Sequence, residues 1–235
     1  MFESICRYIQ DLYNSNQVPL HAPIFSERDK VMVNECIDST FVSSVGAFVG
    51  QFEKMVATYT GAQFAIATVN GTSALHIALL LAGVEKDTEV LTQSLTFVAT
   101  ANAILYTGAH PVFLDSADNN LGMCPRDLKE FCLREIEMRG GIPYNRKTGK
   151  RIAACLPMHV FGHPALVNEI DEVCSEFRIP LIEDAAESLG SFLTSGPSSK
   201  HTGNIGKLSI LSFNGNKIIT CGGGGMIITN DALLA

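Results

Sequence analysis

From Phe64 to the end of the chain, short and almost wholly apolar segments alternate with segments of helical periodicity. A strand that is apolar on both sides has to be buried on both sides, which a parallel sheet with helices on each face provides. The pattern therefore predicts a three-layer α/β/α fold with a mostly parallel central sheet. The apolar segments are FAIATV (64–69), EVLT (89–92), HPVFLD (110–115), IAACLPMHV (152–160), PLIED (180–184), LSILSF (208–213) and GMIIT (225–229).

The intervening segments predict the helices of this fold. One helix follows Asn70 (ALHIALLLAG), a second is FVATANAILYTG, a third runs from Pro125 to about Met138, and a fourth lies around Leu166–Phe177. A basic, turn-rich segment, Pro143–Arg151, leads from the third helix to the next strand.

The residues before the first strand predict further helices and an extended arm. Residues 1–13 place apolar side chains at helical spacing, and two prolines then favour an extended chain. A second helix is expected to start near Ser26, and a third lies within residues 48–59. We expect residues 1–18 to form a helix and arm, and residues 19–235 to form one large domain.

Charge and cysteine content exclude several classes of partner. The formal net charge of −7 is unfavourable for a surface that binds nucleic acid or an anionic membrane. No apolar run reaches the length of a membrane span. The seven cysteines are odd in number and form no C-x-x-C pair, which favours a soluble cytoplasmic protein with reduced thiols. No metal site is expected, because the histidines lack ligand spacing; His159 and His163 share a loop that we expect to be structural or to face a substrate.

The segment Asn70-Gly71-Thr72-Ser73 joins a strand to a helix. Glycine allows close backbone approach, the hydroxyls can donate, and the first amides of a helix lack partners within the helix. The junction can therefore bind a phosphate. Taken alone, it fits a simple helix cap at least as well, since Ser and Thr are favoured there.

Two acids, Glu183 and Asp184, end an apolar strand at the edge where open α/β sheets bind ligands. A carboxylate there can ligate a metal, act as a general base, or pair with a cationic ring nitrogen. Capping of the following segment explains Asp184 equally well.

Lys217 follows another apolar strand and precedes Ile218, Ile219 and the glycine run Gly222–Gly225. Desolvation among apolar neighbours favours the neutral, nucleophilic amine that a Schiff-base lysine needs. A single lysine is more often a solvated surface residue. The glycine run could also suggest nucleotide binding, but it lacks G-x-G-x-x-G spacing and precedes a strand rather than a helix.

Together the three motifs match the requirements of pyridoxal 5'-phosphate (PLP). Its phosphate needs donors, its pyridine nitrogen needs a carboxylate to stay protonated, and its aldehyde needs an amine. Phe97 could supply a flat face for the ring, although a core phenylalanine would look the same.

Four segments in the same order and spacing, VNGTSALHIAL, SLTFVATANAI, LIEDAAESLG and LSFNGNKIITCGGGG, resemble the DegT-type sugar aminotransferases, which are fold-type I PLP enzymes. The resemblance runs from about Val18 to the end of the chain. It implies the large domain of that fold, with Gly71, Thr72, Ser73 and Ser212 binding the cofactor phosphate.

The same resemblance implies the roles of the remaining site residues. Phe97 would stack on the pyridine ring, and Asp184 would pair with the ring nitrogen. Glu187, where many relatives carry Gln, would lie near the 3-hydroxyl. Lys217 would bind the cofactor covalently and transfer protons, and its presence favours transamination over the dehydration of a sister branch that has His there.

MHVFGHP (158–164), DSTFVSSVG (38–46) and the N-terminal helix resemble the legionaminic-acid and nonulosonate branch. That branch implies transfer of an amino group from glutamate to C4 of a UDP-linked 4-keto-6-deoxy-N-acetylhexosamine. The family also implies a homodimer and a small C-terminal domain, which we expect to be absent from this chain. A truncated or regulatory PLP-binding protein without turnover and a nucleotide-sugar-binding module are the alternatives.

Overall fold

A computed structural model describes residues 2–193 and 199–235. Within them, two sheets, of strand order β1-β11-β10-β7 and β3-β2-β6, lie edge to edge. Parallel bridges from Cys155 to Leu181 and from Met158 to Asp184 join β6 to β7, so the strands form one continuous layer. The strands are β1 (Phe64–Thr68), β2 (Glu89–Gln93), β3 (His110–Leu114), β6 (Ile152–Leu156), β7 (Ile182–Asp184), β10 (Leu208–Ser212) and β11 (Gly225–Thr229).

The central layer is mostly parallel, as the apolar strands predict. β2 runs parallel to β3 and to β6, and β7 runs parallel to β10. Among the strands of this layer in the described residues, β11 alone runs against its neighbours, β1 and β10. Because β11 lies between β1 and β10 and is antiparallel to both, β1 and β10 run in the same direction. The carboxyl ends of β1 and β10 therefore lie at one edge of the sheet.

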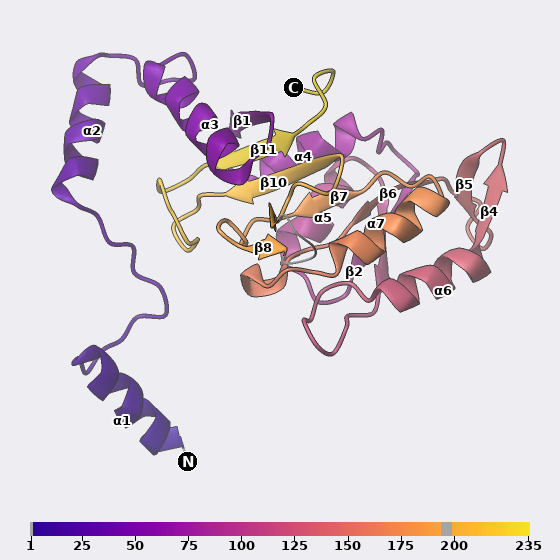
Figure 1. The fold of residues 1–235 in the computed structure, drawn as a ribbon, viewed down its shortest axis with the longest axis horizontal. Helices are drawn as coiled ribbons and strands as arrows, with labels where there is room; N and C mark the ends of the chain where they lie inside the picture. Colours follow the sequence, from indigo (N-terminus) through magenta and orange to yellow (C-terminus); the bar gives the residue numbers. More distant parts are fainter. Residues whose placement is uncertain (1, 194–198) are drawn as a thin grey trace.

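Helices cover both faces of this layer, which confirms the three-layer fold (Figure 1). α4 (Gly71–Leu81) and α5 (Val98–Tyr106) pack on one face, and α3 (Ala47–Thr60), α6 (Pro125–Glu135) and α7 (Val167–Glu176) pack on the other. Successive residues of a strand point to opposite faces, so neighbours in β10 enter different cores. Ile210 belongs to the α4 core and Leu211 to the α3 core.

The expected helix from Pro125 to about Met138 is wrong in its last turn. α6 ends at Glu135, and Ile136–Arg139 forms β4, which pairs with β5 (Ile142–Asn145) in an antiparallel hairpin. Gly140 and Gly141 both have positive φ, 59° and 82°, and two such residues form the tight turn that suits the twist of a hairpin. The Gly140-Gly141 pair is the sequence signal for this turn. The helical spacing of the preceding apolar residues nevertheless favoured a longer helix.

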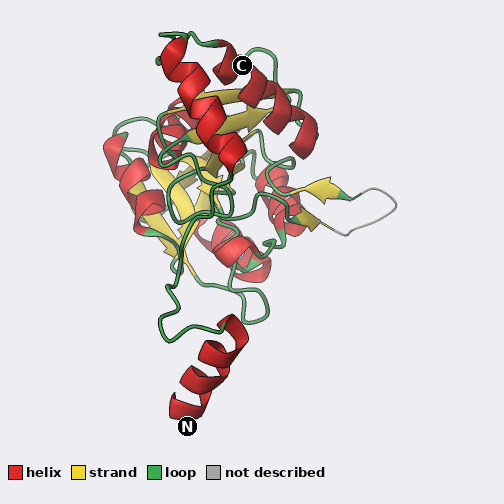
Figure 2. Ribbon diagram, turned by 90° about the vertical axis from the view of Figure 1, so that its left-hand side faces the viewer, coloured by secondary structure: helices red, strands yellow, loops and turns green. Residues whose placement is uncertain are grey.

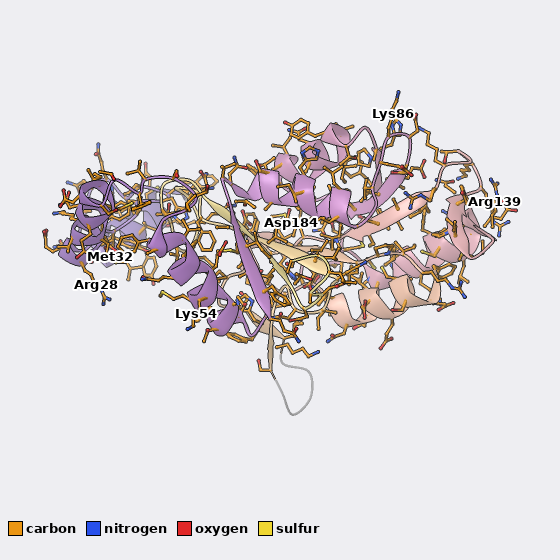
Figure 3. All side chains as sticks on the ribbon, turned by 90° about the horizontal axis from the view of Figure 1, so that it is seen from above. Arg28, Met32, Lys54, Lys86, Arg139 and Asp184 are labelled. Carbon is orange, nitrogen blue, oxygen red and sulfur yellow. The ribbon has the colours of Figure 1, made fainter. Side chains whose placement is uncertain are left out.

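The N-terminal helices project from the body of the protein, and Asp29 at the start of the second one lines a pocket with Lys217 and Ile218. α1 (Phe2–Tyr13) and α2 (Glu27–Asp38) contain no buried residue. Figure 2 shows α1 projecting from the body at the end of a long connection, and Figure 3 places Arg28 and Met32 of α2 at one extremity, far from Asp184. The predicted start of α2 is confirmed, because Ser26 and Asp29 form a reciprocal capping box.

Two further features complete the described chain. β8 (Phe192–Leu193) and β9 (Lys200–His201) form a small antiparallel hairpin, and η1 (Val160–Gly162) is a short 3-10 turn after β6. None of the helices within residues 2–193 and 199–235 is long and apolar enough to cross a membrane.

Candidate active site

The strand ends bring the predicted site residues to one edge of the sheet. Asn70 follows β1, Asp184 is the last residue of β7, and Ser212 is the last residue of β10. All three strands present their carboxyl ends there, the edge at which open α/β sheets bind ligands. Residues far apart in the sequence therefore meet because of strand direction.

A pocket of about 300 Å³ opens at this edge. Its lining comes from β7 and β10, from the segments that follow the strands, and from the first turns of α4 and α5. It is lined by Asn70, Gly71, Thr72, Leu75, Phe97, Ala99, Met158, Asp184, Ala186, Ile210, Ser212, Asn214, Asn216 and Lys217.

One wall of the pocket is the N-terminus of α4. Asn70 caps this helix, with its Oδ1 accepting a hydrogen bond of 2.8 Å from the amide of Ser73. Gly71 lies against Ser212, and a Cβ at position 71 would be 2.9 Å from the Cβ of Ser212 and 3.1 Å from its Oγ. The absence of a side chain thus lets the serine hydroxyl and the first amides of α4 line one pocket, a suitable set of donors for an anion.

Gly71→Ala should weaken binding at this wall. The added methyl group overlaps backbone-anchored atoms of Ser212, which can relax only if the helix moves. We expect PLP affinity to fall about tenfold, with a loss of about 1–3 kcal/mol in the free energy of unfolding. PLP titration and urea unfolding would measure the two effects.

Gly50→Ala is the matched control, since nothing lies within 4 Å of its added Cβ on α3. The free energy of unfolding of G50A should rise slightly, because alanine has a higher helix propensity than glycine. Its PLP affinity should not change. Equal PLP affinities for the two variants would contradict the role of Gly71.

Asp184 supplies a buried carboxylate, 2 % exposed, at the base of the pocket. Its Oδ2 accepts a hydrogen bond of 2.7 Å from Thr100 Oγ1, and its Oδ1 accepts one of 3.2 Å from the amide of Ala186. Burial raises the pKa of Asp184, while the Thr100 and Ala186 hydrogen bonds and the charge of Lys217 act in the opposite direction. A buried carboxyl of this kind is suited to a cationic partner in the same pocket.

Lys217 provides the amine. Its side chain is 9 % exposed, its Nζ lies 3.0 Å from Glu187 Oε1, and the same Nζ lies 5.5 Å from the centre of the Phe97 ring. Among the described residues that line the pocket, Lys217 is the one lysine. Lys207 precedes β10 and so lies at the opposite end of that strand from Ser212.

The pocket gathers six of the eight residues singled out from the sequence: Gly71, Thr72, Phe97, Asp184, Ser212 and Lys217. The other two do not line it. The amide of Ser73 is held by Asn70. Glu187 reaches the site only through its ion pair with Lys217, and its second oxygen accepts a hydrogen bond of 3.1 Å from the amide of Phe161.

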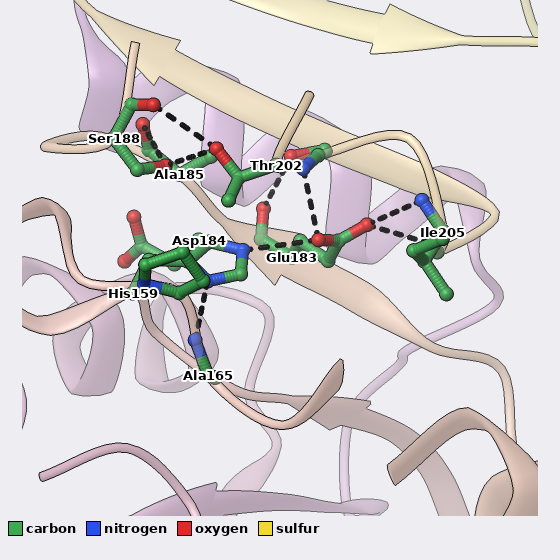
Figure 4. Close-up of polar contacts among 12 residues, drawn as sticks. His159, Ala165, Glu183, Asp184, Ala185, Ser188, Thr202 and Ile205 are labelled. Atoms are coloured by element: carbon green, nitrogen blue, oxygen red, sulfur yellow. Dashed lines mark hydrogen bonds and ion pairs between the residues drawn. The ribbon is translucent and has the colours of Figure 1, made fainter. Parts of the chain in front are cut away.

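The other face of β7 carries a buried polar network (Figure 4). Glu183 is fully buried, and its two carboxylate oxygens accept hydrogen bonds from the amides of Gly203, Ile205 and Gly206 and face His159 Nε2 at 3.0 Å. The amide of Ala165 donates to His159 Nδ1, so the ring proton lies on Nε2 and points at Glu183. His159 is thus a structural residue of this loop, one of the two roles expected for it.

Glu183→Gln should destabilise the fold. The glutamine side chain would place its own N–H donors against the backbone amides that donate to Glu183. We expect a loss of about 3–5 kcal/mol in the free energy of unfolding at pH 7. Burial by itself would raise the pKa of Glu183, but the hydrogen bonds from His159, Gly206 and Gly203 outweigh it and lower that pKa.

The stability supplied by Glu183 is therefore fully present above the pKa of its unfolded state, and it is lost progressively as the pH falls from there through the lower pKa of the folded state. Urea unfolding at pH 7 and at about pH 4 should show the difference between wild type and E183Q shrinking at the lower pH. Glu137→Gln, on the exposed hairpin, serves as control and should change unfolding by no more than about 0.5 kcal/mol. An E183Q protein as stable as wild type at pH 7 would contradict this account.

Several residues of the site escaped sequence reasoning. Asn214 and Asn216 lie in the quoted motif before Lys217 and could have been included on that ground. Thr100 and Met158 carry no signal of their own, because their roles depend on contacts across the fold. Phe161 contributes its backbone amide, which donates to Glu187 and which no side-chain pattern reveals.

Known proteins are similar to this chain in sequence and in fold. The family model described as the DegT/DnrJ/EryC1/StrS aminotransferase family matches residues 23–235. A protein described as the putative pyridoxal phosphate-dependent aminotransferase EpsN of Bacillus subtilis is 39% identical over 215 residues, and a GDP-perosamine synthase of Escherichia coli O157:H7 is 37% identical over 217 residues. Each alignment covers 92% of this chain, with 52% and 54% of the respective relative.

A solved structure gives the same result in three dimensions. The structure of DesI in the presence of its TDP-sugar product superposes with a TM-score of 0.76 at 28% identity, covering 91% of this chain and 49% of that one. The chain therefore spans about half the length of the relatives that it matches.

Proposed function

Because the chain belongs to the DegT/DnrJ/EryC1/StrS aminotransferase family, we propose that it forms the cofactor-binding part of a PLP-dependent sugar-nucleotide aminotransferase. The observation that carries the proposal is one pocket lined by an amine, a buried carboxylate and the start of a helix, whose first amides suit an anion. These groups are Lys217, Asp184 and the α4 N-terminus beside Ser212.

The residues present fit PLP, the cofactor used by aminotransferases of this family. Gly71 lacks the side chain that would fill the space beside Ser212, which leaves the helix amides open to a phosphate. Asp184 is buried with a raised pKa, as expected for a carboxylate that gains stability from a cationic ring nitrogen. Lys217 provides the amine that an aldehyde requires. When bound, PLP supplies the electron sink that lets an amino acid lose its α-proton.

The protein's own groups then have separate tasks. Asp184 would stabilise a positive charge on the ring nitrogen of bound PLP. Glu187 and Phe97 contact the Lys217 amine, which aims it into the pocket. As a free amine, Lys217 would be placed to accept a proton from the amino donor and to return it to the sugar.

The finer proposal concerns the substrates. On the likeness of residues 38–46 and 158–164 to the nonulosonate branch, we propose transfer from glutamate to C4 of a UDP-linked 4-keto-6-deoxy-N-acetylhexosamine by a homodimer. Similar proteins include GDP-perosamine synthases, so the nucleotide is the element to vary in a test.

The test has two stages. Visible absorbance of the protein with PLP, before and after borohydride, followed by peptide mapping, should place the cofactor on Lys217. Glutamate should then abolish the absorbance of the lysine-bound form, and 4-keto sugars carrying UDP, GDP or TDP should be compared as acceptors. Binding without a response to glutamate would support instead a PLP-binding protein without turnover.

A further inference from the structure

A chain of hydroxyl groups reaches the buried carboxylate of Asp184 from α5. Thr100 Oγ1 donates to Asp184 Oδ2 at 2.7 Å, and Thr96 Oγ1 lies 2.8 Å from Thr100 Oγ1. Thr100 is fully buried. An ionised carboxylate can only accept, so the single hydroxyl proton of Thr100 is committed to Asp184, and its oxygen is left to accept from Thr96.

The same helix start also carries the aromatic wall of the pocket. Phe97 is the N-cap residue of α5, and its amide and the Thr96 hydroxyl lie 3.4 Å and 3.3 Å from the sulfur of Met158. Met158 itself is joined to Asp184 by a bridge between β6 and β7. One segment, residues 96–100, therefore sets both the ring face and the hydrogen bond to the carboxylate.

We propose that Thr100 is a positioning residue that keeps Asp184 ionised and oriented toward the pocket, with Thr96 polarising its hydroxyl. One oxygen of Asp184 is occupied by Thr100 and the other by the amide of Ala186, so the carboxylate cannot rotate without losing a hydrogen bond. A hydrogen bond donated to the charged form of an acid favours that form. The role of this charge rests on the proposed function; the link between Thr100 and Asp184 does not.

Other charged groups act on Asp184 from neighbouring elements and must stay constant in a test. Burial opposes the ionised form of Asp184, and the charge of Lys217, after β10, favours it. His159, after β6, directs its one ring proton at Glu183. Glu183 lies on the other face of β7 and is held by His159. Substitution of Thr100 leaves all three in place.

The experiment measures the titration of Asp184 in the cofactor-free chain. Protein labelled with carbon-13 at the aspartate carboxyl would be titrated by NMR, with the Asp184 signal identified by its loss in D184N. In Thr100→Val, which keeps the shape and removes the hydroxyl, the midpoint should rise by about one pH unit, a tenfold change in the protonation equilibrium. Thr100→Ser, which keeps the hydroxyl, should restore the wild-type midpoint.

Thr92→Val is the matched control, because Thr92 is equally buried and donates its hydroxyl to the carbonyl of Leu156 at 2.8 Å, away from Asp184. It should lose comparable stability and leave the Asp184 midpoint unchanged. An unshifted midpoint in T100V, or the same shift in T92V, would overturn the role of Thr100 and leave the proposed function standing. Failure of the wild type to bind PLP would overturn the proposed function and leave the link between Thr100 and Asp184 intact.

Discussion

Lys217→Ala should abolish covalent attachment of PLP and reduce transamination by at least about 10³-fold, since both the attacking amine and the proton-transfer group are removed. Absorbance in the presence of PLP should be that of unattached cofactor, and borohydride should leave no label on the chain. The fold should persist, because Lys217 lies in the loop after β10 rather than in a core cluster.

Lys207→Ala is the control for this result. Lys207 immediately precedes β10, at the end of the strand opposite to the pocket. The K207A protein should bind PLP and turn over as wild type does. Borohydride-trapped label on Lys207 or Lys200 in the wild-type protein would refute the assignment of Lys217.

Asp184→Asn should leave the fold intact while slowing proton abstraction from the amino donor by about 10²–10⁴-fold. A neutral amide cannot keep the pyridine nitrogen protonated, so the electron sink weakens. Rapid-mixing measurement of the half-reaction with glutamate would give the rate.

The same variant separates function from stability. The folded-state pKa of Asp184 is raised by burial, so its ionisation opposes folding as the pH rises above the unfolded-state pKa. Cofactor-free D184N should therefore be at least as stable as wild type at pH 7 in urea unfolding. A slower half-reaction with a large loss of stability would show that Asp184 is structural.

Asp171→Asn is the matched control, since burial also raises the pKa of Asp171 but this residue lies on α7, outside the pocket. Its half-reaction rate should equal that of wild type. A wild-type rate in D184N would instead mean that Asp184 only caps the segment after β7.

Much of the architecture was predictable because it follows from local pattern. Strands that are apolar on both sides, such as LSILS in β10, require cover on both faces, and a helix start such as Asn70 follows from capping chemistry. The local pattern predicted the wrong element where a helical spacing and a turn motif occur in the same segment. Around Glu135–Arg139, helical spacing outweighed the Gly140–Gly141 turn that the chain adopts.

The sequence by itself therefore determined the layered sheet, the strand end that carries Asp184, the segment after a strand that carries Lys217, and the family that their motifs identify. The tertiary structure decided which groups touch. Thr100 reaches Asp184 across 84 positions, and Lys217 reaches Glu187 across 30. Gly71 matters because Ser212 lies beside it. Such contacts depend on strand order and helix placement, which are set by the packing of the whole chain, whereas the periodicity that reveals strands and helices is a property of each segment alone.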